Sequence, residues 1–529
     1  MSIEELEVTS AESLQPVRLR VEGNLADARR KFRDQLRKVL DPRRQAGESP
    51  EAAAARSFLI RYLRENVEAA ETIASMKDLI QEFEALAPVI LVHKCIDGRV
   101  HGSKGIGYPP TTVDFLRTEG CKLDTDSTNQ IFWEKMDIAV MEAAHNTPGT
   151  PALFIELAHT ATEGHGCAAQ SMPCMSPQAV VENSLQTVKE HADKVRDHYG
   201  NSVFALHGIT NTDDMSETLI FENGTELSTS KFIEAAGLND PDEVFTPDFL
   251  SAEITDPSII KHVGRTTFGD LLSGDLPKIY NDLRSGIAME VYLMKMISSG
   301  NNSIVNPKIM GLIEDVFTSA KNIPDSLRRP LIYQTIWNIA YTLYQRNRLR
   351  LMEGANKFRD KHLEHAEELI GYGEGYELLR RNKAALAKTG RGDDKKALTV
   401  AKKVLDGNRK KSADAEHPQP HRPIVHINIE VSGDITSWHQ FNKQVLVKLK
   451  VMSERVREVY GDESVCIMTT YSHASGKQFY PVQVYPRPLR TEQNSSSFGV
   501  NVAAGLKDFP EFATELNNRE ITFTEYFAQ

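Results

Sequence analysis

Two apolar runs, Pro88–Val92 (PVILV) and Ala152–Ala158 (ALFIELA), decide how this chain is expected to fold. Short apolar runs of this length predict strands that are buried on both faces. Each run leads directly into a stretch rich in polar residues, His93–Arg99 (HKCIDGR) after the first and His159–Cys167 (HTATEGHGC) after the second. The sequence therefore places two thiols, several imidazoles, a carboxylate and a guanidinium group at the ends of two predicted strands.

Strands and helices alternate around these runs. Ser176–Pro177 combines a cap residue with proline, which is typical of a helix start, and this helix is predicted to end at Tyr199–Gly200. A strand is predicted at Ser202–Leu206, then a polar loop at Gly208–Asp214 and a strand at Leu219–Phe221. The alternation predicts an α/β fold with parallel strands, in which functional groups collect at the carboxyl ends of the strands.

Three domains are predicted, because 529 residues exceed what one core usually holds. Residues 1–86 show helical spacing and are predicted to form an N-terminal helical domain. Residues 87–405 are predicted to hold the site and a helical extension, which includes Ile332–Leu349 and Lys357–Leu369. A basic stretch, interpreted as a solvated helix, and a proline-containing linker lead to a third domain at 418–529.

The third domain resembles part of the second. Each of two matching segments closes a predicted helix and opens a predicted strand, and each has a similar strand upstream. The helix-to-strand segments are Val195–Val203 and Val456–Val465, and the upstream strands are Phe154–Leu157 and Asn428–Val431. This long internal period indicates a duplicated unit. The position that matches His159 falls near Gly433 and the segment that carries Cys167 is absent, so the second copy is predicted to lack that thiol and the imidazole.

Composition narrows the class of protein. A net charge of −11 argues against general nucleic-acid binding. The basic stretch Lys383–Lys411 lacks the interleaved aromatic residues that stack on bases. No run of 18 apolar residues and no secretory leader is visible, so no membrane span is expected. Five cysteines in so long a chain suit a reducing compartment, and the predicted location is the cytoplasm.

Cys95 and Cys167, together with one histidine, can supply three protein ligands to zinc and leave the fourth position for water. Two histidines are candidates. His159 directly ends a predicted strand and is preferred, whereas His165 is separated from Cys167 by one residue, which makes a tight chelate. The remaining candidates are at most outer neighbours of the site (His93, His101 and His207) or free thiols (Cys121, Cys174 and Cys466).

Asp97 and Arg99 follow Cys95 closely enough to act beside such a metal. Asp97 could bind the zinc or accept a proton from the zinc-bound water, and Arg99 could pair with Asp97 and keep it ionised. The alternative is that Cys95 is a small buried residue and that Asp97 and Arg99 form a surface ion pair.

Three motifs together resemble the β-type carbonic anhydrases, and most closely their carboxysome shell branch. The first is Cys-x-Asp-Gly-Arg at Cys95–Arg99. The second is the strand-end His159 followed, after an insertion, by Gly-Cys-Ala-Ala at Gly166–Ala169. The third is the Gly-x-x-x-Thr-Asp loop at Gly208–Asp213.

The resemblance implies a fold and a set of roles. The fold is a β-carbonic-anhydrase-like domain with a parallel-core sheet, preceded by a helical domain and followed by a degenerate, metal-free repeat of the catalytic unit. Cys95, His159 and Cys167 are implied as ligands of Zn²⁺, with Asp97 and Arg99 as the catalytic dyad.

The expected activity is the reversible hydration of carbon dioxide to bicarbonate by a carbonic anhydrase, with zinc-bound hydroxide as the nucleophile. Two alternatives stay open: a hydrolase of the same fold acting on carbonyl sulfide or carbon disulfide, and a non-catalytic, zinc-stabilised assembly protein. A homo-oligomer is expected. The resemblance names the carboxysome shell and Rubisco as partners, and the carboxysome as a location within the cytoplasm.

Overall fold

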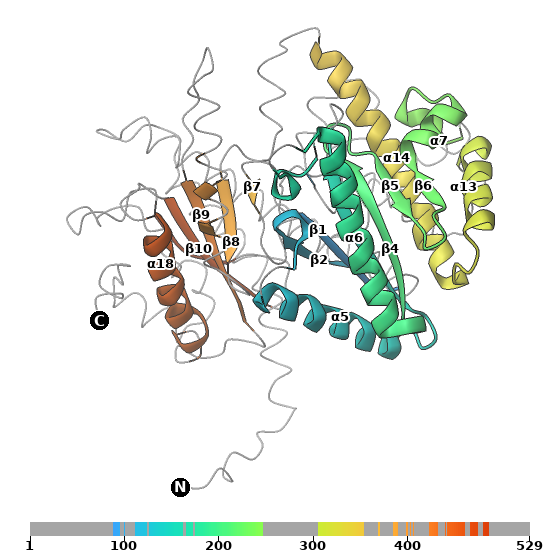
Figure 1. Ribbon diagram of the computed structural model, residues 1–529. Coiled ribbons are helices and arrows are strands. Elements are labelled where there is room, and N and C mark those ends of the chain that lie inside the picture. The colour runs from blue at the N-terminus through green and yellow to red at the C-terminus, as the bar shows by residue number, and fades with distance from the viewer. Residues whose placement is uncertain are drawn as a thin grey trace, which may run out of the picture. The chain divides into compact units, whose positions relative to one another are not determined.

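A computed structural model describes the central part of the chain and several shorter stretches (Figure 1). The longer ranges are 88–95, 112–123, 126–161, 166–172, 175–246 and 305–353. The shorter ones are 100, 369–370, 385–389, 398–399, 402–403, 406, 423–431, 440, 442–460, 466–473 and 480–485. The predicted N-terminal domain, 1–86, lies outside the described residues.

The larger sheet is mixed and mostly parallel. Its strands are β1 (Ile90–Cys95), β2 (Val113–Thr118), β3 (Ala152–Thr160), β4 (Val203–Asn211), β5 (Glu217–Ile220) and β6 (Glu226–Ser228), in the order β2-β1-β3-β4-β5-β6. The first four strands pair in parallel, and β5 and β6 pair antiparallel. The prediction of an α/β fold with a parallel core is confirmed at this level.

Helices cover both faces of this sheet (Figure 1). α5 (Asp126–Asn146) and α6 (Pro177–Tyr199) share a core with one face, which includes Leu91 and Phe154. α7 (Thr229–Ala236), α13 (Pro307–Ala320) and α14 (Asp325–Glu353) pack on the other face around Ile155 and Trp337. α5 and α6 lie on the same face because both connect parallel strands in the same direction, and such crossovers are right-handed.

Capping residues set both ends of α6. The Ser176 hydroxyl oxygen accepts a hydrogen bond of 3.2 Å from the Ala179 N–H, and Pro177 occupies the first turn. Gly200 follows the last helical residue with φ +53°, a conformation that favours glycine. The predicted start and end of this helix are therefore confirmed.

Other predicted boundaries need correction. β1 was predicted to end at Val92 but continues to Cys95, and the predicted loop at Gly208–Asp214 is strand as far as Asn211. The polar residues there are accommodated because neighbouring strands supply backbone partners on both sides. The predicted basic helix at Lys383–Lys411 contains a strand, β8 (Ala385–Thr389), which pairs in parallel with β7 (Leu369–Ile370).

The chain divides into two compact units, one containing β1 to α14 and the other containing the C-terminal elements. The second unit runs β9 (Pro423–Val431), α18 (Val447–Tyr460), β10 (Cys466–His473) and β11 (Tyr480–Tyr485). β9 and β10 pair in parallel, and β10 and β11 pair antiparallel. The series β3, α6, β4 and β5 has the same pairing. The duplication itself remains a prediction.

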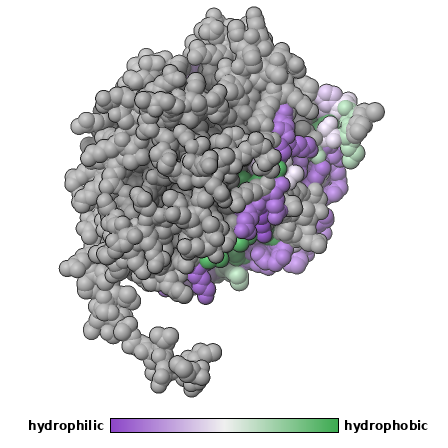
Figure 2. All heavy atoms as spheres, turned by 90° about the vertical axis from the view of Figure 1, so that its left-hand side faces the viewer, coloured by the Kyte–Doolittle hydropathy of each residue, from purple (hydrophilic) through white to green (hydrophobic). Residues whose placement is uncertain are grey.

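The described surface is largely polar on the face shown in Figure 2, with smaller hydrophobic areas between hydrophilic side chains. The exposed large hydrophobic side chains include Met141 on α5, which is 64% exposed, and Met172, which is 61% exposed. Within the described part of the chain, no helix has the length and apolar character needed to cross a membrane.

Candidate metal centre

The predicted ligands lie where the topology of the sheet changes direction. From β1 the sheet extends one way to β2 and the other way to β3 and β4. In α/β sheets this switch point leaves a crevice at the carboxyl ends of the two central strands, and ligands bind there. Cys95 is the last residue of β1, and His159 is the second-to-last residue of β3.

Cys167 is brought back to this edge by a short backbone bridge. Thr160 at the end of β3 pairs antiparallel with Gly166, which places the next residue, Cys167, near the end of β3. A β-carbon on Gly166 would lie 2.7 Å from Val180 Cγ1 and 3.1 Å from the backbone of α6. Glycine is required there because the loop and α6 approach so closely, and Cys167 follows directly.

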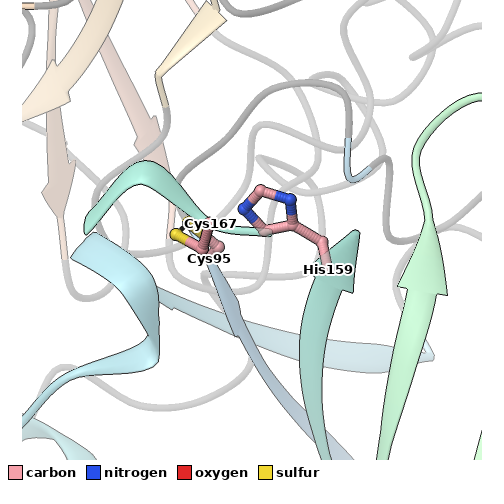
Figure 3. A group of neighbouring side chains, drawn as sticks. All are labelled: Cys95, His159 and Cys167. Atoms are coloured by element: carbon pink, nitrogen blue, oxygen red, sulfur yellow. Dashed lines mark hydrogen bonds between the residues drawn. The ribbon is translucent and has the colours of Figure 1, made fainter. Parts of the chain in front are cut away.

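The three side chains converge in a buried cluster. The sulfur atoms of Cys95 and Cys167 are 3.7 Å apart, and one ligand atom from each of Cys95, His159 and Cys167 lies within 4.8 Å of the other two. The exposed fractions are 3%, 2% and 5%. Figure 3 shows the imidazole extending from the end of β3 toward both sulfur atoms.

This spacing fits a tetrahedral metal ion. A zinc ion with Zn–S bonds of about 2.3 Å holds two sulfur ligands about 3.8 Å apart, whereas a disulfide bond would need about 2.05 Å. The observed 3.7 Å agrees with the first arrangement and excludes the second. The site therefore accommodates a metal with two thiolates and one imidazole.

The electrostatics also favour a cation here. The pKa of the Cys95 thiol lies well above its usual value, first because it hydrogen-bonds to Cys167 and then because it is buried beside that second sulfur. His159 acts in the opposite direction and lowers it. Two adjacent thiolates in a buried site need a positive charge between them, and a bound metal supplies it while releasing the protons.

Gln170 anchors the turn that carries Cys167. Its side-chain nitrogen donates a 2.6 Å hydrogen bond to the Gly120 carbonyl, just past β2, and its side-chain oxygen accepts one of 3.0 Å from Asn183 on α6. Lys122 also donates to the Ala169 carbonyl. The turn is thus tied to two elements outside its own loop, which limits the positions that Cys167 can take.

Four residues discussed from the sequence lie outside the described residues: Asp97, Arg99, His101 and His165. The preference for His159 over His165 as a ligand, and the dyad of Asp97 and Arg99, therefore remain predictions. Cys174 lies outside as well.

Three of the remaining outer candidates lie among the described residues: His93, His207 and Cys121. His93 hydrogen-bonds to Glu156 and Thr118. Burial is the main reason that the pKa of His207 falls to about 4. Cys121 is a free, buried thiol, as predicted, and donates to the Leu157 carbonyl at 3.1 Å.

No role was predicted from the sequence for three polar residues that have structural importance: Glu156, Gln170 and His191. Glu156 carried a signal, because it is the one charged residue inside the apolar run ALFIELA. A buried carboxylate needs partners, so its position predicts a histidine or cation nearby. His191 carried a weaker signal: it lies three residues after Val188 and four before Val195, on the apolar face of the predicted helix.

Comparison with known proteins adds no family assignment: no family model matches this sequence, and no curated protein does so either. The observation that bears on function is therefore the buried Cys95, His159 and Cys167 cluster at the end of a mostly parallel sheet.

Proposed function

We propose that the chain is a zinc-dependent carbonic anhydrase of β-like fold. One observation carries the proposal: two thiols and an imidazole from β1, β3 and the following turn converge, with the sulfur spacing of a tetrahedral zinc site, at the switch point of the sheet. The Cys-x-Asp-Gly-Arg motif that begins with Cys95 links this metal site to that reaction.

The donor set supports zinc over other metals. Thiolate ligands are soft and select zinc, copper(I) or iron–sulfur clusters over magnesium, calcium and manganese. Structural zinc sites usually have four protein ligands and often close cysteine pairs, whereas catalytic sites have three and keep an open position. Cys95 and Cys167 come from separate elements and do not form such a pair, which favours the catalytic type.

Each residue then has a stated role. Cys95, His159 and Cys167 hold the metal, and a bound zinc supplies a nucleophile near neutral pH because it lowers the pKa of water to about 7. Asp97 lies two residues beyond the end of β1 and accepts a hydrogen bond or proton at its carboxylate. Arg99 pairs with that carboxylate and keeps it ionised.

The finer architecture belongs to the same proposal. The parallel core supports a β-type fold. The shared pairing of β3 to β5 and β9 to β11 supports the C-terminal unit as a degenerate repeat. The second copy has no counterpart of the Cys167 turn in its sequence, so it acts as an internal partner without a metal.

The test is metal analysis combined with a carbon dioxide hydration assay on the full chain. Cys95→Ser and His159→Ala should each remove both the zinc of this site and the activity. Asp97→Asn should keep the zinc and lower kcat/KM by about 100-fold or more, since it removes a proton acceptor. Cys121→Ser, which keeps a donor for the Leu157 carbonyl, is the matched control and should retain both.

Three results would separate this proposal from its alternatives. Faster turnover of carbonyl sulfide than of carbon dioxide would favour the hydrolase. Unchanged function in Asp97→Ala, with unfolding in Cys167→Ala, would favour a zinc-stabilised assembly protein. Loss of zinc in His165→Ala, with zinc retained in His159→Ala, would refute the ligand assignment.

A further inference from the structure

A second cluster of metal-binding side chains lies under α6. His93 on β1, Glu156 on β3 and His191 on α6 are 0%, 0% and 8% exposed. His93 and Glu156 are direct neighbours in the register of the two parallel strands. None of the three belongs to the Cys95, His159 and Cys167 set, so this cluster needs its own explanation.

Both imidazoles contact the Glu156 carboxylate. Glu156 Oε1 lies 2.7 Å from His93 Nδ1 and 3.0 Å from His191 Nδ1. One ligand atom from each residue lies within 4.8 Å of the other two. Two imidazoles from different elements thus direct the same ring nitrogen at a single oxygen atom.

The other carboxylate oxygen is unsatisfied. Glu156 Oε2 is buried and has no hydrogen-bond partner among the described residues. Buried carboxylate oxygens are expected to be hydrogen-bonded or to coordinate a metal, because burial removes their water. Both observed contacts fall on Oε1 and leave Oε2 without a partner in the described part of the chain. A cation between the three side chains would satisfy the carboxylate.

Thr118 orients one of the imidazoles. His93 Nε2 lies 2.8 Å from the Thr118 hydroxyl oxygen. The Thr118 hydroxyl can donate to this nitrogen or accept from it. In the tautomer in which Nε2–H donates to Thr118, Nδ1 presents a lone pair toward Glu156, and this is the form of the ring that binds a metal ion. Metal-binding histidines commonly have the ring nitrogen opposite the metal fixed by such a hydrogen bond.

We propose that His93, Glu156 and His191 form a second metal site, which binds a first-row divalent transition-metal ion such as Zn²⁺ or Fe²⁺. Two imidazoles and one carboxylate are a donor set that both ions accept, whereas Mg²⁺ and Ca²⁺ prefer oxygen ligands only. The ion joins β1, β3 and α6 at the centre of the unit.

A cavity of about 260 Å³ adjoins this site at His191. Its wall includes His191 and Phe132, and Phe132 also packs edge-on against His93, with ring centroids 5.4 Å apart. Of the three proposed ligands, His191 is the one that lines this cavity. The alternative to a bound metal ion is that each imidazole carries a proton toward Glu156. The cluster would then be a buried hydrogen-bonded network without metal.

The experiment counts metal ions in the full chain by elemental analysis after growth with zinc and iron. The natural chain should hold about two ions, and His191→Ala should hold about one. His198→Ala is the control: His198 lies two turns further along α6, is exposed, and contacts the Trp133 ring at a tilt and the Tyr199 ring edge-on. It should retain both ions.

A double variant, Cys95→Ser with Cys167→Ser, separates this site from the thiol site. It should keep about one ion and should lose that ion when His191→Ala is added. Cobalt(II) loading gives a second readout, because thiolate ligation produces an intense charge-transfer band and imidazole–carboxylate ligation does not. The double variant should bind cobalt without that band.

The proposal is overturned if the double variant binds no zinc, iron or cobalt, or if His191→Ala retains the full metal content of the natural chain. If His191→Ala does not fold, His191→Gln and the cobalt titration of the double variant decide the question. If the thiol site does not bind zinc, Cys95→Ser should have the same metal content as the natural chain. That result does not affect the test of the second site by His191→Ala.

Discussion

At the scale of single residues, Gly166 decides whether Cys167 reaches the metal. Its α-carbon faces Val180, and an added methyl group would have to displace that side chain and press on the backbone of α6. We expect Gly166→Ala to destabilise the fold by about 1–3 kcal/mol, as overpacking does, and to weaken zinc binding. Gly311→Ala, at an open helical position in α13, should be neutral or stabilising. Equal zinc affinity in Gly166→Ala and Gly311→Ala would show that Gly166 does not position Cys167 for metal binding.

Glu217 gives the protein a pH dependence with a defined sign. Burial raises the pKa of its carboxyl from 4.5 to about 7, and Gln334, Lys94 and Thr210 offset only part of that effect. Below about pH 4.5 the carboxyl is neutral in both states. Between about pH 4.5 and 7 the carboxyl ionises in the unfolded chain but stays protonated in the folded chain, so stability falls as the pH rises through this range.

The measurement for Glu217 is denaturant unfolding at two pH values. Glu217→Gln should raise the free energy of unfolding at about pH 8, by up to about 3 kcal/mol, and leave it nearly unchanged near pH 4.5. Glu226→Gln, a partly exposed position paired with Lys231, is the control and should show little change at either pH. The same difference at both pH values would show that ionisation is not the cause.

The sequence predicted part of this residue-level picture. The convergence of Cys95, His159 and Cys167 followed from their places after apolar runs, because parallel strands end at one edge. Glu156 and His191 could not be paired from sequence, since they come from a strand and a helix 35 residues apart. Their meeting depends on where α6 packs along the sheet, which the apolar spacing of α6 does not specify.

At the scale of elements, local chemistry explains which predictions succeeded. The limits of α6 were predicted correctly because Ser176 and Gly200 act within the helix itself. β2 was missed because Asp114 and Arg117 interrupt its apolar pattern. Arg117 is only 4% exposed and donates to the Val100 carbonyl at 2.8 Å, so a distant segment satisfies it. Tertiary contacts of this kind override strand propensity.

The turn that carries Cys167 should lose its metal more readily when its anchor is removed. Gln170→Ala deletes the hydrogen bonds to Gly120 and from Asn183, leaving the turn held by fewer partners. We expect the rate of zinc transfer to a competing chelator to rise by about 10-fold, because removing groups that support metal ligands weakens metal affinity by about 10- to 100-fold. Helix content should change little.

The control for this element is Gln178→Ala on the first turn of α6. Gln178 is exposed, and its side chain donates only to Glu182 one turn along the same helix. Its removal should leave the transfer rate unchanged. A similar acceleration in both variants would mean that α6 fraying, and not the anchor of the turn, controls zinc release.

At the scale of the whole molecule, the two compact units have related strand pairing but different chemistry. β3 to β5 and β9 to β11 share one parallel and one antiparallel contact. Both groups of potential metal ligands found among the described residues belong to the unit that contains β1 to α14. Metal binding should therefore stabilise one unit and leave the other unaffected, since a ligand stabilises only the folded part that binds it.

Hydrogen exchange with and without a chelator tests this difference. A metal present at about 100 times its Kd stabilises its unit by about 2.7 kcal/mol, and that protection disappears when the ion is removed. Amides of β1 and β3 should then exchange faster by about 100-fold, since local opening reports local free energy. Amides of β9 and β10 should exchange at unchanged rates. In the variant that combines Cys95→Ser, Cys167→Ser and His191→Ala, the chelator should have no effect on either unit. Equal acceleration in β1 and β9 would show that the two units unfold as one, which would contradict a division in which only the first unit depends on metal.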